Sequence, residues 1–580
     1  MGLLFPVSCS RDNVRSANLS LTRSNSSMRT SFRVVTAACV AAIAFDGAAR
    51  AQAPRFEVTV DPAARATPLT GRLVVVVSKT AQPEPRMIIA PQGPAVFAID
   101  LDQLRAGEAA IVDAKTSLGY PMPLAQLPAG DYYAQAIVNV YEPITRADGK
   151  TIWVHFNDGT QEVMQIAAGN VYSDVHKIQV GRGGTVKLRI DKVIPPSPRP
   201  KDTDWVRYVR IQSQKLTAFW GRPVYVHATV LLPKGYNDHP SVKYPTVYTF
   251  GHNVPFSFTP DSTRIRGIGQ LSPVTGLETG YDFYKAWISD GFPRFIAVSF
   301  EQATPFFLDS YSVNSASNGP YGDAMEQEII PELERQFRMI GKPYARLAEG
   351  ASTGGWQTLA LQLKHPDFFG GAWVLQPDPI DFRRYQLVDI YSDTNAFVLP
   401  NTQLTTTERP FRRTVEGQVA WTLRQLSLFE EVLGTRGRSN YQLEGWEAVY
   451  GPLDADGYPK PLWNKLTGTI DRGVANAMRD NGYDLRDYAQ KNWDTLGPKV
   501  AGKLHFFAGD MDDFYLNLAV YRFEEFLKGT EIGKTVPFTY GRPMKGHSWH
   551  VMPWAELVRQ MGAHVKKNAP AGEDASAWWY

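Results

Sequence analysis

A serine lies at the centre of residues 350–354, which read Gly-Ala-Ser-Thr-Gly. Gly-x-Ser-x-Gly is the pattern of a nucleophile elbow, a strand-to-helix turn so tight that the residues beside the strained serine must be small. The helix after such a turn points its N-terminus at the reacting carbonyl group. Strand-like and helical runs flank the segment, so Ser352 is the candidate nucleophile for acyl transfer, although ordinary glycine turns can show the same pattern.

A serine hydroxyl is a weak nucleophile at neutral pH, so it needs a general base nearby and a carboxylate that orients the base. After an elbow of this kind the chain order is serine, acid, histidine. The last histidines with suitable neighbours lie in residues 546–550, Gly-His-Ser-Trp-His. His547 is the preferred base because Gly546 frees the backbone to present the ring. His550 is the alternative, and it could instead pack or cap a helix near Trp554.

Three aspartates follow a predicted strand at 504–508, where the ligand crevice of an open α/β sheet is expected. Asp512 is preferred as the acid, Asp513 is second and Asp510 third, because the others suit the cap of the next helix. Asp378 also follows a predicted strand and is a further alternative, although a proline-turn aspartate accounts for it more simply.

Acyl transfer also requires donors aimed at the developing oxyanion. One should be the backbone N–H of Thr353. The second should come from the loop after an early strand, where His252 or Asn253 fits and Gly251 allows close approach. This chemistry needs no cofactor, and no metal is expected because the histidines show no ligand spacing and His-Glu-x-x-His does not occur.

The chain beyond residue 205 alternates strand and helix patterns, which is typical of a largely parallel sheet covered on both faces. An amphipathic helix is expected over 323–338, kinked or restarted at Pro331. The order of elements around Ser352 is that of the α/β-hydrolase fold. The other expected elements are strands at 224–232, 245–250, 295–300, 372–376, 504–508 and 536–540 and helices at 356–364 and 514–528.

Residues 381–500 are too long for a simple connection and are rich in aromatic residues. We expect an inserted cap over the active site, with a surface excursion remote from the chemistry as the alternative. Trp446, Tyr450 and Trp463 could stack on a sugar or a phenolic acyl group, although aromatic side chains more often belong to the core.

Residues 54–194 show short β-rich runs separated by turn residues, among them 132–141 and 163–166. This spacing predicts an immunoglobulin-like β-sandwich domain. A proline-rich stretch at 195–204 then predicts a stiff linker, and residues 205–580 form the predicted catalytic domain.

The N-terminal residues 1–53 resemble a secretory leader. Arg29 and Arg33 precede an apolar run at 34–45 and a small-x-small cleavage pattern at 49–53. The run is shorter than the roughly 20 residues that span a bilayer, so we expect cleavage, best after Ala51, and no membrane insertion afterwards. The protein is therefore predicted to be secreted or periplasmic, with Met28 as the suspected true start.

Composition excludes several other classes. The formal net charge is +3 over 580 residues and no long basic run occurs, so a nucleic-acid partner is not expected. Both cysteines, Cys9 and Cys39, lie in the leader, which excludes disulfides and cysteine catalysis in the mature chain. A lipoprotein signal at Cys39 is disfavoured because Thr36 stands where an aliphatic residue is needed.

Several ordered motifs together resemble the esterase D-like family of α/β-hydrolases, which includes feruloyl and other carbohydrate esterases. They are Lys-Tyr-Pro at 243–245, Glu-Ile-Ile-Pro-Glu-Leu-Glu at 328–334, the elbow at 350–355, Gly-x-x-Asp at 509–512 followed by Phe514, and Gly-His-Ser-Trp at 546–549. The resemblance spans about residues 206–558.

This resemblance implies an exported serine esterase with Ser352 as nucleophile, Asp512 as acid and His547 as base, and the family's Gly-x-x-Asp pattern favours Asp512 over Asp513. Its substrate would be a small-molecule or polysaccharide-linked ester, with carbohydrate and phenolic esters as the candidates. The insertion at 381–500 and the N-terminal β-domain depart from the family pattern and leave the substrate open. The alternatives are a serine peptidase of the same fold and a non-catalytic protein that binds a glycan or an envelope partner.

Overall fold

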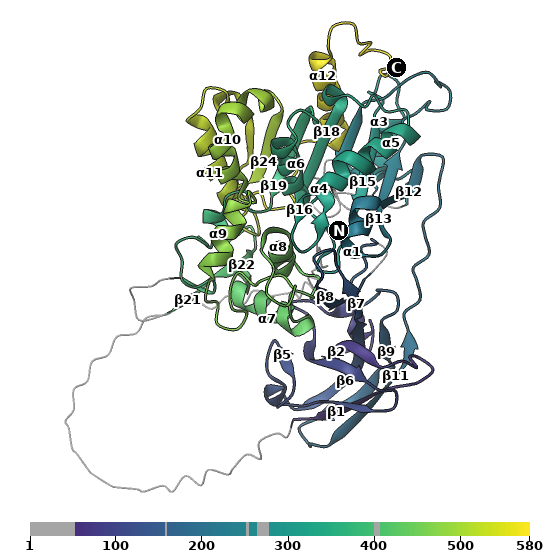
Figure 1. Ribbon diagram of the computed structural model, residues 1–580, viewed down its shortest axis with the longest axis vertical. Coiled ribbons are helices and arrows are strands. Elements are labelled where there is room, and N and C mark those ends of the chain that lie inside the picture. The colour runs from purple at the N-terminus through teal and green to yellow at the C-terminus, as the bar shows by residue number, and fades with distance from the viewer. Residues whose placement is uncertain (1–52, 157–158, 251–253, 264–277, 400–405) are drawn as a thin grey trace, which may run out of the picture.

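The computed structural model describes residues 53–156, 159–250, 254–263, 278–399 and 406–580 (Figure 1). The predicted leader, apart from Ala53, lies outside the described residues, and so do both candidate donors of the early loop, His252 and Asn253.

An eight-stranded sheet forms the centre of the C-terminal domain, in the order β12-β13-β15-β14-β18-β19-β24-β25. β13 runs antiparallel to both of its neighbours, and the strands from β15 to β25 are parallel. In this mixed sheet β13 runs opposite to the other strands, and β15 lies between β13 and β14 although it follows β14 in the chain. This arrangement confirms the predicted α/β-hydrolase order. The strands are β12 (Val206–Ser213), β13 (Val224–Leu231), β14 (Thr246–Thr249), β15 (Ile296–Glu301), β18 (Arg346–Ser352), β19 (Gly371–Pro377), β24 (Leu504–Gly509) and β25 (Phe538–Gly541).

Helices cover both faces of this sheet, as the alternation of side chains along β19 shows. Ala372 and Val374 belong to the same buried cluster as residues of α6, α10 and α11, whereas Trp373 and Leu375 share a second cluster with α3 and α12. Successive side chains of a strand point to opposite faces, so two helical layers are needed to bury both sets. The helices are α3 (Gly280–Trp287), α6 (Thr353–Lys364), α10 (Leu485–Val500), α11 (Asn517–Lys528) and α12 (Trp554–Asn568).

The helix expected over 323–338 is divided. α4 (Tyr321–Ala324) leads into a π-helical turn at Met325–Ile329, and α5 (Ile330–Gln336) follows with Pro331 in its first turn. Proline has no N–H to donate to the preceding turn, so the hydrogen-bond ladder shifts where the sequence predicts a kink.

The N-terminal domain is all-β. Hydrogen bonds join nine strands into one sheet, β4-β1-β11-β9-β6-β2-β3-β5 with β10 beside β6, so the two separate sheets of the predicted sandwich are not confirmed. The strand expected at 163–166 is wrong, because the chain forms turns there and buries Met164. The strands are β1 (Arg55–Val60), β2 (Leu69–Ser78), β3 (Ala95–Leu104), β4 (Ala109–Val112), β5 (Leu118–Tyr120), β6 (Gly130–Val140), β9 (Val171–Ser173), β10 (His176–Val180) and β11 (Thr185–Val193), and a separate hairpin joins β7 (Glu142–Thr145) to β8 (Thr151–Val154).

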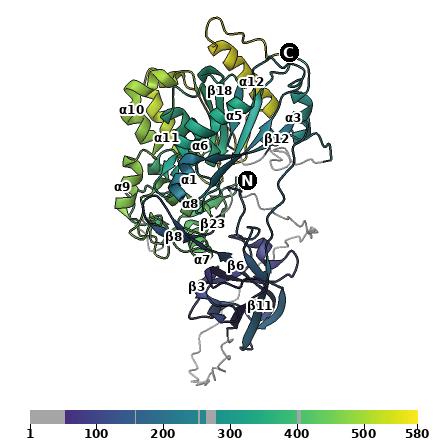
Figure 2. The ribbon, with the colours of Figure 1, turned by 45° about the vertical axis from the view of Figure 1, so that its right-hand side comes forward.

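The insertion at 381–500 packs against both domains. Figures 1 and 2 show its helices α7 (Leu423–Leu433) and α8 (Gln442–Tyr450) between the β-domain and the eight-stranded sheet. Buried Arg72 of β2 donates to the carbonyl oxygens of Val432, at 3.0 Å, and Glu431, at 3.2 Å. One buried cluster contains side chains of β2, of α7 and α8 and of the eight-stranded sheet, so the three parts share a core. The insertion also contains α9 (Arg472–Asp480) and the hairpin of β22 (Pro410–Arg413) with β23 (Val419–Thr422).

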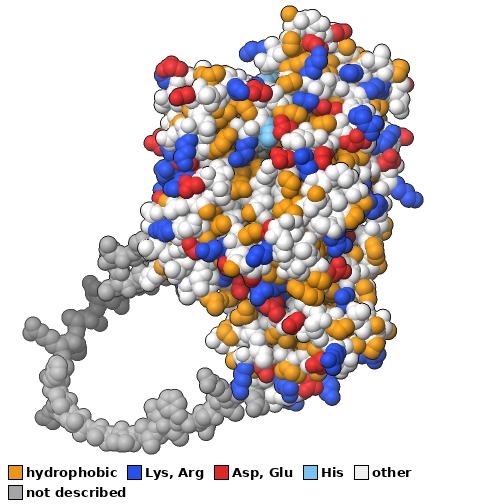
Figure 3. Space-filling model, viewed as in Figure 1, with side chains coloured by type: hydrophobic (Ala, Val, Ile, Leu, Met, Phe, Trp, Pro, Cys, Tyr) orange, Lys and Arg blue, Asp and Glu red, His pale blue; other side chains and the backbone are white. Residues whose placement is uncertain are grey.

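Acidic and basic side chains are interspersed over the face drawn in Figure 3. No helix within the described ranges is long and apolar enough to cross a membrane.

Candidate active site

Ser352 occupies a strained turn between β18 and α6. Its backbone has φ 58° and ψ −120°, a combination that non-glycine residues rarely adopt and that clusters at functional sites. A Cβ added to Gly350 would lie 2.5 Å from the carbonyl carbon of Gly354, and one added to Gly354 would lie 1.8 Å from the carbonyl oxygen of Phe250. Both glycines are therefore required by close backbone approach, and the chain leaving β14 touches the elbow.

His547 and Asp512 are brought together from the ends of the last two strands of the sheet. His547 Nδ1 lies 2.7 Å from Asp512 Oδ2, and Asp512 is fully buried. The other oxygen of Asp512 accepts the backbone N–H groups of Phe514, at 2.9 Å, and Leu516, at 3.2 Å. The carboxylate is thus fixed by its own loop and offers one oxygen to the imidazole.

The neighbouring aspartates have other partners. Asp513 Oδ1 accepts the backbone N–H of His547 at 3.1 Å, and its second oxygen lies 3.5 Å from Arg412. Asp510 accepts a hydrogen bond from Tyr521 at 2.5 Å and pairs with Arg542. Asp513 therefore holds the loop of His547, whereas Asp510 binds Tyr521 and Arg542.

Gly546 serves a purpose other than the predicted backbone freedom. Its φ is not positive, but an added Cβ would lie 2.6 Å from Asp513 Oδ1. The absence of a side chain allows Asp513 to reach the His547 N–H.

His550 packs, as the alternative reading expects. Its Nδ1 lies 3.1 Å from the carbonyl oxygen of Met552, and its ring centroid is 3.9 Å from that of Trp554. Burial lowers the pKa of His550 to about 4, which disfavours its charged form.

Among the described contacts, Asp378 forms no hydrogen bond with His547 but contacts Ser352. The Ser352 hydroxyl donates to Asp378 Oδ1 at 3.2 Å. Burial raises the pKa of the Asp378 carboxyl, while hydrogen bonds and the nearby charge of His547 act in the opposite direction. Four side chains donate to its other oxygen, namely Tyr311, Thr353, Gln442 and Trp446. The proline-turn interpretation of Asp378 is therefore incomplete.

Ser352, Asp378 and His547 open on one cavity of about 400 Å³. Its walls come from all three parts of the chain. The β-domain contributes Pro91, Gln161 and Val163; the insertion contributes Gln386, Phe411, Arg412, Trp421, Leu426, Asn440, Tyr441, Gln442 and Trp446; the rest of the C-terminal domain contributes the other residues, including Phe250, Glu349, Asp513, Phe514, Trp549 and Trp554.

The predicted oxyanion donors are only partly described. Thr353 is the first residue of α6, so its backbone N–H stands at the helix N-terminus directly after the nucleophile. His252 and Asn253 lie outside the described residues, and the described chain that leads to them, ending at Phe250, lies against the elbow.

Of the aromatic residues singled out in the insertion, Trp446 reaches the cavity, where its indole N–H donates to Asp378 at 3.0 Å. Tyr450 and Trp463 are buried in the core. Sequence reasoning missed Tyr311 and Gln442, which carry no motif and reach the site only through the tertiary fold.

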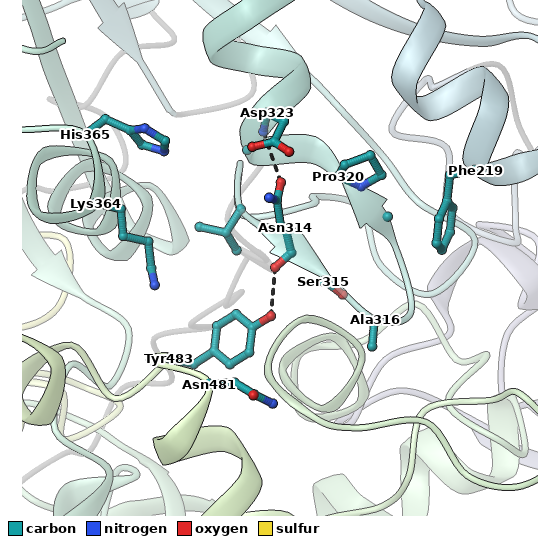
Figure 4. Close-up of a pocket in the computed structure, with 13 residues that line it drawn as sticks. Phe219, Asn314, Ser315, Ala316, Pro320, Asp323, Lys364, His365, Asn481 and Tyr483 are labelled. Atoms are coloured by element: carbon teal, nitrogen blue, oxygen red, sulfur yellow. Dashed lines mark hydrogen bonds between the residues drawn. The ribbon is translucent and has the colours of Figure 1, made fainter. Parts of the chain in front are cut away.

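A second hollow, of about 760 Å³, lies beside α4 and the end of α6 (Figure 4). Tyr483 donates to the carbonyl oxygen of Asn314 at 2.7 Å across it. Its serine, Ser315, donates to Ala448, and its histidine, His365, lies 2.9 Å from Glu326. Ser315 and His365 therefore bind separate partners and not each other, so this hollow is a weaker candidate for the active site than the cavity at Ser352.

No protein-family model matches the sequence, and no curated protein matches it. Solved structures similar to the chain include a ferulic acid esterase, with 14% identity over 63% of this chain and 98% of the other and a TM-score of 0.34. An S-formylglutathione hydrolase from Staphylococcus aureus shows 12% identity over 62% and 99%, with a TM-score of 0.28. A ferulic acid esterase from Anaeromyces mucronatus shows 10% identity over 63% and 93%, with a TM-score of 0.27. These are enzymes of the kind that the sequence motifs resemble, and the function proposed below rests on the site geometry.

Proposed function

We propose that this protein is a serine hydrolase that cleaves carboxylic esters through an acyl-enzyme. One observation carries the proposal. Ser352, held at φ 58° in its elbow, opens on the same 400 Å³ cavity as His547, whose Nδ1 is bonded to the buried carboxylate of Asp512.

The reaction begins when Ser352 Oγ turns from Asp378 to the imidazole of His547. Catalytic hydrogen bonds are often absent or long before substrate binds, so this rotation is part of substrate binding. Oγ then attacks the ester carbonyl while His547 takes its proton, and the same proton protonates the departing alcohol. Asp512 holds the tautomer in which His547 Nε2 is free to act. Water then attacks the acyl-enzyme with the same proton transfers through His547, and the carboxylic acid is released.

The backbone N–H of Thr353 is the proposed first donor to the oxyanion, and the loop at His252 and Asn253 is the proposed source of the second. Aromatic side chains line much of the cavity, among them Phe411, Trp421 and Trp549. They support a phenolic or carbohydrate ester as substrate, because flat rings and sugar faces stack on aromatic groups.

We expect kcat/KM to decrease on the acidic side of its pH profile, and we expect the midpoint of this decrease to lie above pH 6.5. Burial opposes the charged imidazolium of His547, but Asp512, Asp513 and Asp378 outweigh it and hold the pKa of His547 above its ordinary value of 6.5. A general base must be unprotonated, so kcat/KM should fall as the pH drops through this raised pKa. A pH profile of kcat/KM measures it, and a limb midpoint below 6.5 would contradict the assignment of His547.

The reaction class is tested with p-nitrophenyl acetate and methyl ferulate. We expect the mature protein to release p-nitrophenol from the first, and preference between the two esters will begin to define the pocket. Failure to hydrolyse either ester would reject the simple esterase and favour the peptidase or the binding protein.

We further propose export, on the evidence of the basic and apolar leader segment. N-terminal sequencing of the protein recovered outside the cytoplasm should begin at Gln52, the residue after Ala51.

A further inference from the structure

Asp378 is a buried carboxyl at the nucleophile that the proposed triad does not use. It is 2% exposed, and its Oδ1 lies 3.2 Å from Ser352 Oγ. Its position follows from the end of β19, the strand beside the elbow strand, and its backbone N–H donates to the Ser352 carbonyl at 3.0 Å. A carboxyl in this place can contact a group that binds beside Ser352 in the cavity.

One oxygen of Asp378, Oδ2, accepts hydrogen bonds from four side chains. Tyr311 donates to Oδ2 at 2.5 Å and Trp446 at 3.0 Å, with Gln442 at 3.1 Å and Thr353 at 3.2 Å beside them. An indole N–H can only donate, so Oδ2 serves as an acceptor. Trp446 and Gln442 also each donate to the Tyr311 hydroxyl at 2.7 Å, which directs the Tyr311 proton to Asp378. The carboxylate is fixed in one orientation.

The other oxygen, Oδ1, faces Ser352. Among the described side chains, the Ser352 hydroxyl is its one donor. Attack on a carbonyl requires this hydroxyl to turn to His547, and the turn leaves a buried carboxylate oxygen without a partner. Such an oxygen is costly to leave unpaired. A donor on the substrate can take the place of the hydroxyl.

The charges that line the cavity favour a cationic donor. Arg412 lines the cavity, but it already forms an ion pair with Asp513 at 3.5 Å. Burial raises the pKa of Glu349, which lines the same cavity, to about 8, so Glu349 is largely neutral at pH 7. Within the described chain no lysine or arginine forms an ion pair with Asp378. Buried carboxylates are usually paired with a cation, and here the substrate can supply it.

The distances agree with a cation next to the scissile carbonyl. A carbonyl carbon about to be attacked lies about 3 Å from Oγ. Before the hydroxyl turns to His547, Asp378 Oδ1 lies 3.2 Å from the same Oγ, so a group on the carbon next to the carbonyl can occupy the position that the hydroxyl leaves. We propose that Asp378 binds an ammonium group on the carbon next to the scissile carbonyl, so that the preferred substrates are aminoacyl esters or peptides with a free N-terminus.

This inference rests on the proposed hydrolase function. It is tested by the ratio of kcat/KM between esters with and without an ammonium group. Methyl esters of alanine, lactate and propionate have nearly the same shape and differ in carrying an ammonium, a hydroxyl or neither. We expect kcat/KM for the alanine ester to exceed that for the propionate ester by about tenfold or more, as for a charged hydrogen bond. The lactate ester should fall well below the alanine ester. A wild-type ratio near one, or lactate equal to alanine, would overturn the proposal.

Asp378→Asn should bring the alanine-to-propionate ratio close to one. Glu349→Gln is the matched control, because it replaces a carboxyl in the same cavity that is largely neutral at pH 7, and it should keep the wild-type ratio. A ratio that survives in Asp378→Asn rejects the assignment. Dialanine then distinguishes the two sources of the ammonium group. Its cleavage indicates peptide N-termini, and cleavage of the alanine ester alone indicates aminoacyl esters.

A binding measurement needs no change at Asp378 and separates this inference from the proposed function. Ser352→Ala removes the hydroxyl that occupies Oδ1, so calorimetry should detect alaninamide binding at least about tenfold tighter than propionamide. Equal binding would overturn the ammonium site. If propionate ester is hydrolysed without any ammonium preference, the hydrolase stands and the inference falls. If no ester is hydrolysed but alaninamide binds selectively, the inference stands and the hydrolase falls.

Discussion

Ser352→Ala is expected to reduce kcat for ester hydrolysis by about 10⁴-fold or more, as the loss of a triad nucleophile does. Ser352 is the proposed site of the acyl-enzyme, because the elbow presents its side chain to the cavity at a backbone geometry that α6 and the close contacts of Gly350 and Gly354 impose. Alanine removes only the hydroxyl, so the fold should persist. Residual turnover would come from binding and the oxyanion donors acting on water. Progress curves with p-nitrophenyl acetate measure the effect.

Ser548→Ala is the matched control for this substitution. Ser548 lines the same cavity and follows the proposed base, but no elbow surrounds it. Its loss should change kcat by less than about tenfold, because neither the nucleophile nor the general base is touched. Comparable losses in both variants would contradict the assignment of Ser352, and so would a Ser352→Ala enzyme that retains most of its activity. Thermal unfolding of both variants checks that the fold is intact.

The catalytic sheet and the residues nearest to the chemistry could be predicted because local patterns encode them. The elbow needs two small residues around Ser352, and the close approach at Gly354 explains why the pattern is so restrictive. Parallel strands end at a common edge of the sheet, so residues that follow β24 and β25 must meet there. Hence Asp512 and His547, which are 35 residues apart, could be expected to lie together, and the structure places them 2.7 Å apart.

The role of Asp378 could not be predicted, because its partners arrive through tertiary packing. Trp446 lies 68 residues further along the chain, in the insertion, and Tyr311 lies 67 residues earlier, in a loop with φ 61°. No spacing in the sequence marks these residues as neighbours. The position after a buried strand was the one available signal, and it indicated an alternative acid rather than a contact with the nucleophile.

The N-terminal domain shows the same limit. Its β-rich pattern was sufficient to predict strands, but strand pairing depends on contacts between distant segments, and the hydrogen bonds that join nine strands into one sheet leave the predicted sandwich unconfirmed. The run at 163–166 has the residue types of a strand, yet the chain turns there and Val163 lines the cavity. The contribution of this domain to the cavity wall therefore could not be predicted from the periodicity of the sequence.

Asp512→Asn is expected to lower kcat/KM by about 10³- to 10⁴-fold, since the asparagine amide stabilises the wrong imidazole tautomer and removes the charge that stabilises the imidazolium. The fold should tolerate the change. Asp512 Oδ1 accepts the N–H groups of Phe514 and Leu516, and the amide oxygen of asparagine can continue to accept them. That arrangement directs the new NH₂ group toward His547 Nδ1, where a carboxylate oxygen was needed.

Asp513→Asn is the comparison that separates the two aspartates. Asp513 receives the backbone N–H of His547 at 3.1 Å, and an amide oxygen can accept that bond as well. Its ion pair with Arg412 is 3.5 Å long and partly exposed, so its loss should cost little. We expect less than about a tenfold decrease in kcat/KM, the range of a lost positioning contact rather than of a lost triad member. A larger loss in Asp513→Asn than in Asp512→Asn would transfer the acid role to Asp513, whereas the expected order assigns the orientation of His547 to Asp512.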